Sequence, residues 1–184
     1  MNEVLKAINE RYSCRDFSPE ALTSDHIESL VQAALASPSA MNRMPWHIIV
    51  VTDKAFIEEM DAAAMDAVAG WEDKSAYNRM KDRGGKMFYD APCVIFITKD
   101  ASDFATLDCG IVSQNIALAA HSMGLGSVIC GMARIPLGGA KGEAFEKRLK
   151  FPEGHTFGMS VCVGKVNTGK SPHALDASKV TYIK

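Results

Sequence analysis

Long apolar runs are missing from this chain of 184 residues. No stretch approaches the roughly 18 consecutive apolar residues of a membrane-spanning helix, because Asp, Gly, His or Lys interrupts each one. The N-terminus also lacks the basic start, apolar stretch and small-residue cleavage site of a secretory signal. We therefore expect a cytoplasmic protein that has no membrane partner.

An excess of charge of one sign is missing as well. The 20 Lys and Arg residues nearly balance the 22 Asp and Glu residues, which gives a formal net charge of −2. Such a chain has no global positive field to attract a nucleic-acid backbone, so nucleic acid is not an expected partner. The content of 47% hydrophobic and 23% charged residues is that of a folded globular protein.

Paired cysteines, internal repeats and low-complexity tracts are absent too. The five cysteines are odd in number, widely spaced and contain no CxxC pair, which argues against a disulfide framework and against a zinc site. We expect reduced thiols and no metal. Because Gly and Pro separate short elements and form no long linker, we expect one domain over residues 1–184.

Hydrophobic periodicity predicts helices and strands that alternate along the chain. The expected helices cover residues 2–12, 23–37, 54–69, 105–122 and 140–149, and the expected strands cover residues 45–51, 94–98, 127–130 and 159–163. Residues 45–51 are so apolar that we expect a central strand, whereas residues 70–85 are charged and predicted to be irregular. This alternation predicts a sheet covered by helices on both faces, without fixing the strand order.

Three polar side chains near the end of the first predicted helix, Arg11, Ser13 and Arg15, are spaced by two. In extended chain such residues point to one side, so they would form a clamp for an anion. Guanidinium groups bind phosphate oxygens in bidentate fashion, and a hydroxyl adds another donor. An isolated RxSxR is more often a solvated surface turn, so the motif alone leaves both interpretations open.

A turn of small residues, SPSAMNRMPW at positions 37–46, separates the second predicted helix from the first strand. Small side chains let the backbone approach a flat ring closely. Asn42 offers a donor and an acceptor to the mixed edge of a pyrimidine or flavin. An ordinary connecting loop is the alternative interpretation of this segment.

In order and spacing, these motifs resemble the FMN-dependent nitroreductase family. Residues 8–51 resemble its N-terminal pattern of a helix, RxSxR-F, a second helix and A/S-P-S-A-x-N-x-x-P-W before a strand. Residues 108–127, from DCGI through QNIALAA to GLGS, resemble its central helix and the strand that follows. Each motif is weak alone, but the two ordered blocks together are specific.

The resemblance implies an α+β fold of three α/β/α layers, with a mixed, mostly antiparallel sheet flanked by helices. It also implies a homodimer that holds FMN in clefts between protomers. The implied FMN-binding residues are Arg11, Tyr12, Ser13 and Arg15 at the phosphate and ribityl group, Pro38, Ser39, Ala40 and Asn42 approaching the ring from the other protomer, and Ile129, Cys130 and Gly131 along the ring.

Three further expectations rest on less certain matches to the family. Its C-terminal Lys and Arg correspond here to the segment KSPH at positions 170–173, so Lys170 and, as a substitute for the Arg, His173 would complete the clamp. Lys86 would contact the pyrimidine edge of the ring. The tail, residues 165–184, would extend onto the partner protomer.

The implied activity is that of an NAD(P)H-dependent flavin oxidoreductase that reduces electron-poor acceptors such as nitroaromatics or quinones. FMN would perform the redox chemistry, so no catalytic side chain is expected. No GxGxxG fingerprint is present, so nicotinamide and acceptor would use the same ring face in turn, a ping-pong mechanism. The alternatives are a flavin-binding redox sensor or carrier without robust turnover, and another flavin reaction, such as enone reduction or dehalogenation, on the same scaffold.

Overall fold

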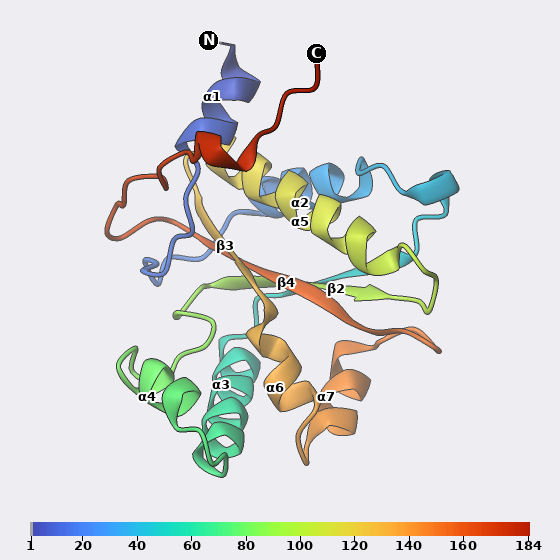
Figure 1. The fold of residues 1–184 in the computed structure, drawn as a ribbon. Coiled ribbons are helices and arrows are strands. Elements are labelled where there is room, and N and C mark those ends of the chain that lie inside the picture. The colour runs from blue at the N-terminus through green and yellow to red at the C-terminus, as the bar shows by residue number, and fades with distance from the viewer. Residues whose placement is uncertain (1) are drawn as a thin grey trace.

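The computed structural model describes residues 2–184, which form three layers: one central sheet and a layer of helices on each of its faces (Figure 1). The strands are β1 (Trp46–Val51), β2 (Cys93–Lys99), β3 (Gly126–Cys130) and β4 (Thr156–Gly164), in the spatial order β1-β2-β4-β3 with every neighbour antiparallel. One parallel bridge, between Ser13 and Ser127, adds the N-terminal segment beside β3. The predicted α+β fold with a helix-flanked, mostly antiparallel sheet is confirmed.

The helices divide between the two faces of the sheet (Figure 1). One face carries α1 (Glu3–Glu10), α2 (Ser24–Leu35) and α5 (Ala105–Ser122). The other carries α3 (Lys54–Ala69), α4 (Ser75–Lys81), α6 (Arg134–Leu137) and α7 (Gly142–Leu149). None of these helices, within the described chain, is both long and apolar enough to cross a membrane.

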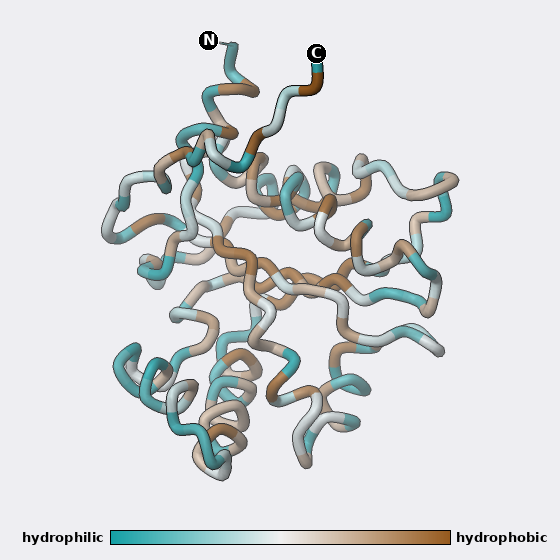
Figure 2. Tube along the Cα trace, viewed as in Figure 1, coloured by the Kyte–Doolittle hydropathy of each residue, from teal (hydrophilic) through white to brown (hydrophobic). Residues whose placement is uncertain are grey.

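Because helices cover both faces, the sheet separates two apolar clusters. Alternate residues of β2 enter different clusters, with Val94 and Phe96 on the α3 side and Ile95 and Ile97 on the α5 side. All four are fully buried. In Figure 2 the strands accordingly form the most hydrophobic part of the trace, with polar segments outside.

The predicted central position of the strand at residues 45–51 is wrong, because β1 lies at one edge of the sheet. Ile49 packs against the cluster on the α3 side, while Ile48 and Val50 pack against the cluster on the α5 side. A strand covered on both faces is apolar at every position wherever it lies in the sheet. The apolar run therefore indicated that both faces of the strand are covered, and it carried no information about the strand order.

The predicted helix starts at residues 2, 23 and 54 are confirmed by capping side chains. Asn2 accepts the amide of Leu5 at 2.9 Å, and Thr23 accepts the amide of His26 at 3.2 Å. Asp53 does the same for α3, through the amide of Phe56. These oxygens satisfy amides that have no partner inside the helix, which is why such residues mark helix starts in a sequence.

Two helices were missed in the sequence. The segment predicted to be irregular contains α4, whose seven residues bury Met80 alone. A single buried position gives no periodicity to detect. The other missed helix, α6, has only four residues and contains Pro136, a helix breaker except in a first turn.

Candidate functional site

The segment that follows α1 lies in extended form beside β3. The amide of Cys14 donates to the carbonyl of Ser127 at 2.9 Å, and the side chain of Cys14 is buried. A Cβ on Gly126 would lie only 2.9 Å from both Cβ and Sγ of Cys14, so this close contact requires glycine. With Cys14 held inward, its neighbours Arg11 and Ser13 are placed on the outer side of the segment.

Arg11 and Ser13 border a cavity of about 200 Å³ together with part of the C-terminal tail. The lining residues are Arg11, Tyr12, Ser13, Lys170, Ser171, Pro172 and His173. The structure therefore brings the predicted N-terminal clamp residues together with Lys170 and His173, which are more than 150 positions away in the sequence.

Cationic side chains line this cavity, and one of them, Arg11, has a hydrogen-bond donor without a partner in the described chain. The Nε atom of Arg11 is buried and has no hydrogen-bond partner among the described residues. The lining contains no carboxylate and includes Lys170 and His173. A buried donor without a partner costs free energy. The donor set suits a phosphate monoester.

Arg15 does not line this cavity. Its guanidinium donates to the carbonyl of Ser13 at 3.4 Å and lies 5.9 Å from the ring centre of Tyr89. Its predicted contact with the phosphate stays a prediction, and the structure places it between the clamp and the loop at residues 86–90.

The small-residue turn after α2 adopts a strained conformation. Met41, Asn42 and Met44 have positive φ angles of 53°, 53° and 47°, which side chains with a Cβ rarely adopt. Such strain persists only where surrounding contacts impose it, and it is concentrated at functional sites. Asn42 is exposed at the tip of this turn.

Two polar residues of α5, which the sequence reasoning did not assign to the site, hold this turn. Asp108 accepts the amide of Ala40 at 3.3 Å, and Asn115 donates to the hydroxyl of Ser37 at 2.9 Å. Asp108 and Ser37 are buried. The available signal was a polar residue on the buried face of an otherwise apolar helix.

The predicted ring-side residues Ile129, Cys130 and Gly131 lie where β3 ends. Ile129 points outward and is 38% exposed, whereas Cys130 is buried and its thiol donates to the carbonyl of Met87 at 3.6 Å. The carbonyl of Cys130 accepts the hydroxyl of Ser160 at 2.6 Å. Burial raises the pKa of the neighbouring Cys162 thiol well above its ordinary value. These contacts fix Cys130 and leave the Ile129 side chain free to meet a ligand.

Lys86 lies at the rim of a different, larger cavity. Its ammonium lies 3.0 Å from a carboxylate oxygen of Asp90 and 3.8 Å from one of Glu58. Those two acids border a cavity of about 660 Å³ whose wall includes Phe17 and Ile57. The charge of Lys86 is balanced by these two carboxylates within its own protomer. The predicted contact of Lys86 with the ring edge stays a prediction.

Within one protomer, the two halves of the predicted site lie at opposite ends of α5. Asp108 in its first turn bonds the small-residue turn, and His121 in its last turn lies 3.8 Å from Glu10, next to Arg11. They are thirteen positions apart in the sequence, which is about 20 Å along a helix at 1.5 Å per residue.

No side-chain cluster for a metal ion was found in the described residues, taking groups of three or more His, Cys, Asp or Glu. All five cysteines are buried and free of disulfides. The candidate site combines an anion cavity, a strained turn and an exposed strand end.

Comparisons with known proteins agree with this geometry. The model of the nitroreductase family matches residues 8–165. A crystal structure of a nitroreductase with bound FMN from Desulfitobacterium hafniense DCB-2 is 46% identical, covers 100% of both chains and superposes with a TM-score of 0.96. An FMN-dependent nitroreductase from Clostridium difficile R20291, 25% identical, covers 99% of both chains with a TM-score of 0.82.

Two curated relatives are longer proteins. A candidate NADH dehydrogenase/NAD(P)H nitroreductase of Methanothermobacter thermautotrophicus is 35% identical over 135 residues, 71% of this chain and 61% of that protein. An NADPH-flavin oxidoreductase of Vibrio harveyi is 28% identical over 173 residues, 89% of this chain and 66% of that protein. The matches thus span less than two thirds of these relatives. On its sequence and its fold, this chain belongs to the nitroreductase family.

Proposed function

We propose that this protein is a cytoplasmic, FMN-dependent oxidoreductase that takes electrons from NAD(P)H and delivers them to electron-poor acceptors such as nitroaromatics or quinones. The observation that carries the proposal is the cavity lined by Arg11, Ser13, Lys170 and His173, with no carboxylate among its lining residues. Five buried, free thiols are typical of a reducing compartment.

The residues of this cavity fit the phosphate of FMN. A phosphate monoester carries about −1.5 to −2 charges near neutral pH, and here it would meet a guanidinium, an ammonium and a hydroxyl with no acid among the lining residues. The nitroreductase of D. hafniense holds FMN on the same fold at 46% identity. The two curated relatives are named as NAD(P)H and NADPH oxidoreductases, which supports a nicotinamide cofactor as the electron donor.

Bound FMN would supply the redox chemistry, accepting a hydride and passing the electrons on. The chain itself would bind and orient the ligands. Arg11 and Ser13 would anchor the phosphate, and the exposed Ile129 would lie against the ring at the end of β3. Since the chain contains no GxGxxG segment for a separate nicotinamide site, donor and acceptor would take turns at one face, which predicts ping-pong kinetics.

A homodimer would assemble both halves of the site, with Pro38, Ser39, Ala40 and Asn42 approaching the ring from the partner protomer. Two apolar surfaces support this assembly. No residue of α1 is buried, and its Val4, Leu5 and Ile8 side chains are exposed. Leu107, on the outer face of α5, is 65% exposed. Exposed apolar side chains on two neighbouring helices favour association with a second copy.

The proposal is tested by recording the absorption spectrum of purified protein and titrating it anaerobically with NADH and NADPH. We expect a flavin spectrum that bleaches within the turnover time. In steady-state assays, plots of reciprocal rate against reciprocal donor concentration at several acceptor concentrations should be parallel lines. A protein without a flavin spectrum after reconstitution with FMN would overturn the proposal. Flavin that binds but bleaches much more slowly than in an enzyme would indicate a redox sensor or carrier.

The tail provides a separate prediction, since residues 167–184 are all exposed on their own protomer. Deleting residues 174–184 removes exposed Leu175, Tyr182 and Ile183 but keeps the residues that line the cavity. If the tail packs on the partner, the dimer dissociation constant should rise at least about tenfold, because apolar area is lost from the interface. Sedimentation at nanomolar to micromolar concentration measures this.

The matched control is Lys170→Ala, which changes the cavity and keeps the rest of the tail. It should weaken FMN binding by about fivefold, near the upper value for an exposed ion pair, while the dimer dissociation constant stays the same. An unchanged dimer after the deletion would show that the tail does not reach the partner.

A further inference from the structure

Asp61 is a buried carboxylate that accepts hydrogen bonds from backbone amides far away in the sequence. It lies in the middle of α3 and is only 3% exposed. Its Oδ1 accepts two amides of one loop, from Met87 at 2.9 Å and from Phe88 at 3.1 Å. Its Oδ2 is buried and has no partner in the described part of the chain. A buried acid that is only half satisfied is costly to keep, which directs attention to what it holds in place.

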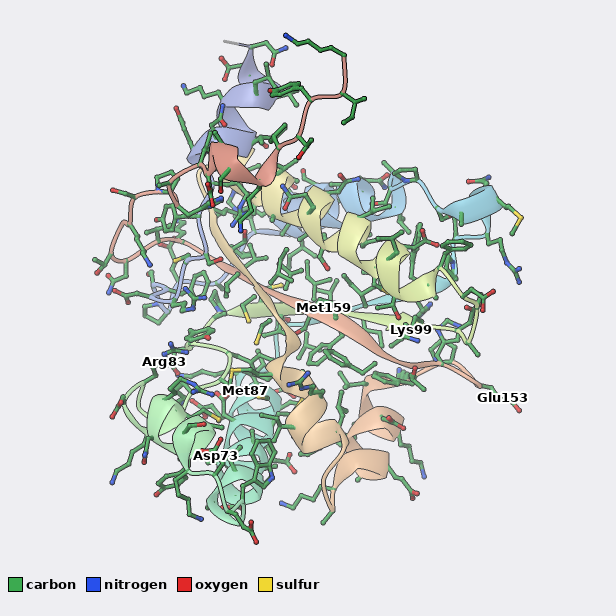
Figure 3. All side chains as sticks on the ribbon, viewed as in Figure 1. Asp73, Arg83, Met87, Lys99, Glu153 and Met159 are labelled. Carbon is green, nitrogen blue, oxygen red and sulfur yellow. The ribbon has the colours of Figure 1, made fainter. Side chains whose placement is uncertain are left out.

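The loop that Asp61 holds is joined to the end of β3. The amide of Met87 binds Asp61, and its carbonyl accepts the thiol of Cys130 at 3.6 Å. Figure 3 places Met87 between the sheet and the helices beneath it. One residue thus connects α3 to the end of β3, where the side chain that precedes Cys130, Ile129, is exposed.

The same loop is strained and reaches the arginine beside the clamp. Tyr89 and Asp90 have positive φ angles of 59° and 56°. The guanidinium groups of Arg83 and Arg15 lie 5.6 Å and 5.9 Å from the ring centre of Tyr89. Two consecutive left-handed residues with side chains need outside contacts to hold them, and the two hydrogen bonds to Asp61 are buried contacts of this kind.

The groups around Asp61 act on its charge in opposite directions. Burial is the largest cause and raises its pKa from 3.8 to about 6, while the two amides and Lys86 oppose that rise and Asp90 adds to it. Lys86 also pairs with Glu58, one helical turn away on α3. From β3 and β4, the thiols of Cys130 and Cys162 face the same carboxylate.

We propose that the ionised carboxylate of Asp61 is a positioning residue, which holds residues 86–90 against the Cys130 end of β3 and thereby sets the affinity of the flavin site. The inference rests on the proposed function for its ligand, FMN. The hydrogen bonds of an ionised acceptor are stronger than those of a neutral one, so a proton on Asp61 loosens the loop without removing it.

The first test follows the backbone amides of Met87 and Phe88 by NMR in the full chain, with its flavin and after flavin removal, between pH 4 and 8. Both amide protons should move together with a midpoint near pH 6, the value to which the pKa of Asp61 is raised. In Asp61→Asn the two signals should stay constant. Flat signals in the unsubstituted protein would overturn the inference. This result does not depend on flavin binding, so it stands or falls separately from the proposed function.

The second test measures FMN affinity at pH 5 and pH 8. At pH 8, Asp61→Asn should bind FMN about five- to tenfold more weakly than the unsubstituted protein, the difference between a charged and a neutral acceptor. At pH 5 the two proteins should bind alike, because Asp61 is then protonated. The phosphate of FMN titrates in both, so its contribution cancels in the ratio.

The matched control is Asp66→Asn, which removes an exposed carboxylate from the same helix. Its FMN affinity should equal that of the unsubstituted protein at both values of pH. An equal loss at pH 5 and pH 8 in Asp61→Asn would show a purely structural role and would overturn the positioning role.

Discussion

Replacement of Arg11 by Ala is expected to weaken FMN binding by about 3 kcal/mol, or roughly 150-fold, the upper range for a hydrogen bond to a charged group. The reason is that the Arg11 side chain lines the cavity together with Ser13 and Lys170, where its guanidinium would pair with the phosphate. Arg15→Ala should cost at least about 1.5 kcal/mol, the lower end of that range, a value that assumes the predicted contact of its guanidinium with the phosphate. Quenching of flavin fluorescence measures both constants.

Riboflavin distinguishes loss of the phosphate contact from general damage to the site. It lacks the phosphate, so its affinity should change by less than about 0.5 kcal/mol in Arg11→Ala. Lys6→Ala, on the exposed surface of α1, provides a charge-matched control and should bind FMN normally. If Arg11→Ala lowers the affinity for both flavins equally, Arg11 does not bind the phosphate.

The second large effect concerns stability and pH. Burial of Asp61 raises its pKa from 3.8 to about 6, so between these values the native state binds a proton that the unfolded state has lost. Stability contributed by this group is therefore greatest below pH 3.8 and falls as pH rises through 6. A shift of this size is equivalent to about 3 kcal/mol. Asp61→Asn carries no such cost, so its free energy of unfolding relative to the unsubstituted protein should rise by about that amount between pH 4 and pH 8.

Chemical denaturation of flavin-free protein at pH 4, 6 and 8, at one fixed protomer concentration, measures this difference. Partly exposed aspartates with lowered pKa, including Asp16 and Asp100, stabilise the fold above their ordinary pKa and so act in the opposite direction. Their effect is the same in both proteins and cancels. Parallel pH profiles for the two proteins would show that Asp61 titrates normally in the fold.

Together, the two experiments on Asp61 separate stability from function. A residue kept only for packing should make the protein less stable when it is replaced. Asp61→Asn is instead expected to gain stability relative to the unsubstituted protein as pH rises from 4 to 8, while it binds FMN more weakly at pH 8. Groups retained at functional sites typically lower stability while they support function.

Local order was predictable where it depends on neighbours in the sequence. The caps at Asn2, Thr23 and Asp53 and the long apolar faces placed the larger helices, because capping and periodicity act within a few residues. α4 and α6 were missed because a short helix with one or two buried residues carries no period. The edge position of β1 was also missed, since coverage of both faces makes an edge strand as apolar as a central one.

The site was predictable in part. The RxSxR spacing and the match to the family indicated the clamp residues, and the tail residues Lys170 and His173 do lie with Arg11 and Ser13. Arg15 was expected in the same cavity, but it lies against Tyr89. Asp61 was not predicted at all, because an acid on an amphipathic helix resembles any solvated residue until its neighbours are known.

The sequence by itself determined the order of the main elements, the family and the residue types of an anion clamp, since these depend on composition and spacing along the chain. Only the tertiary structure decided which residues meet. It placed the tail beside Arg11, put the strained turn about 20 Å away at the other end of α5, and buried Asp61 against two distant amides. The physical reason is that burial and charge pairing depend on distances in space, which a one-dimensional pattern does not contain.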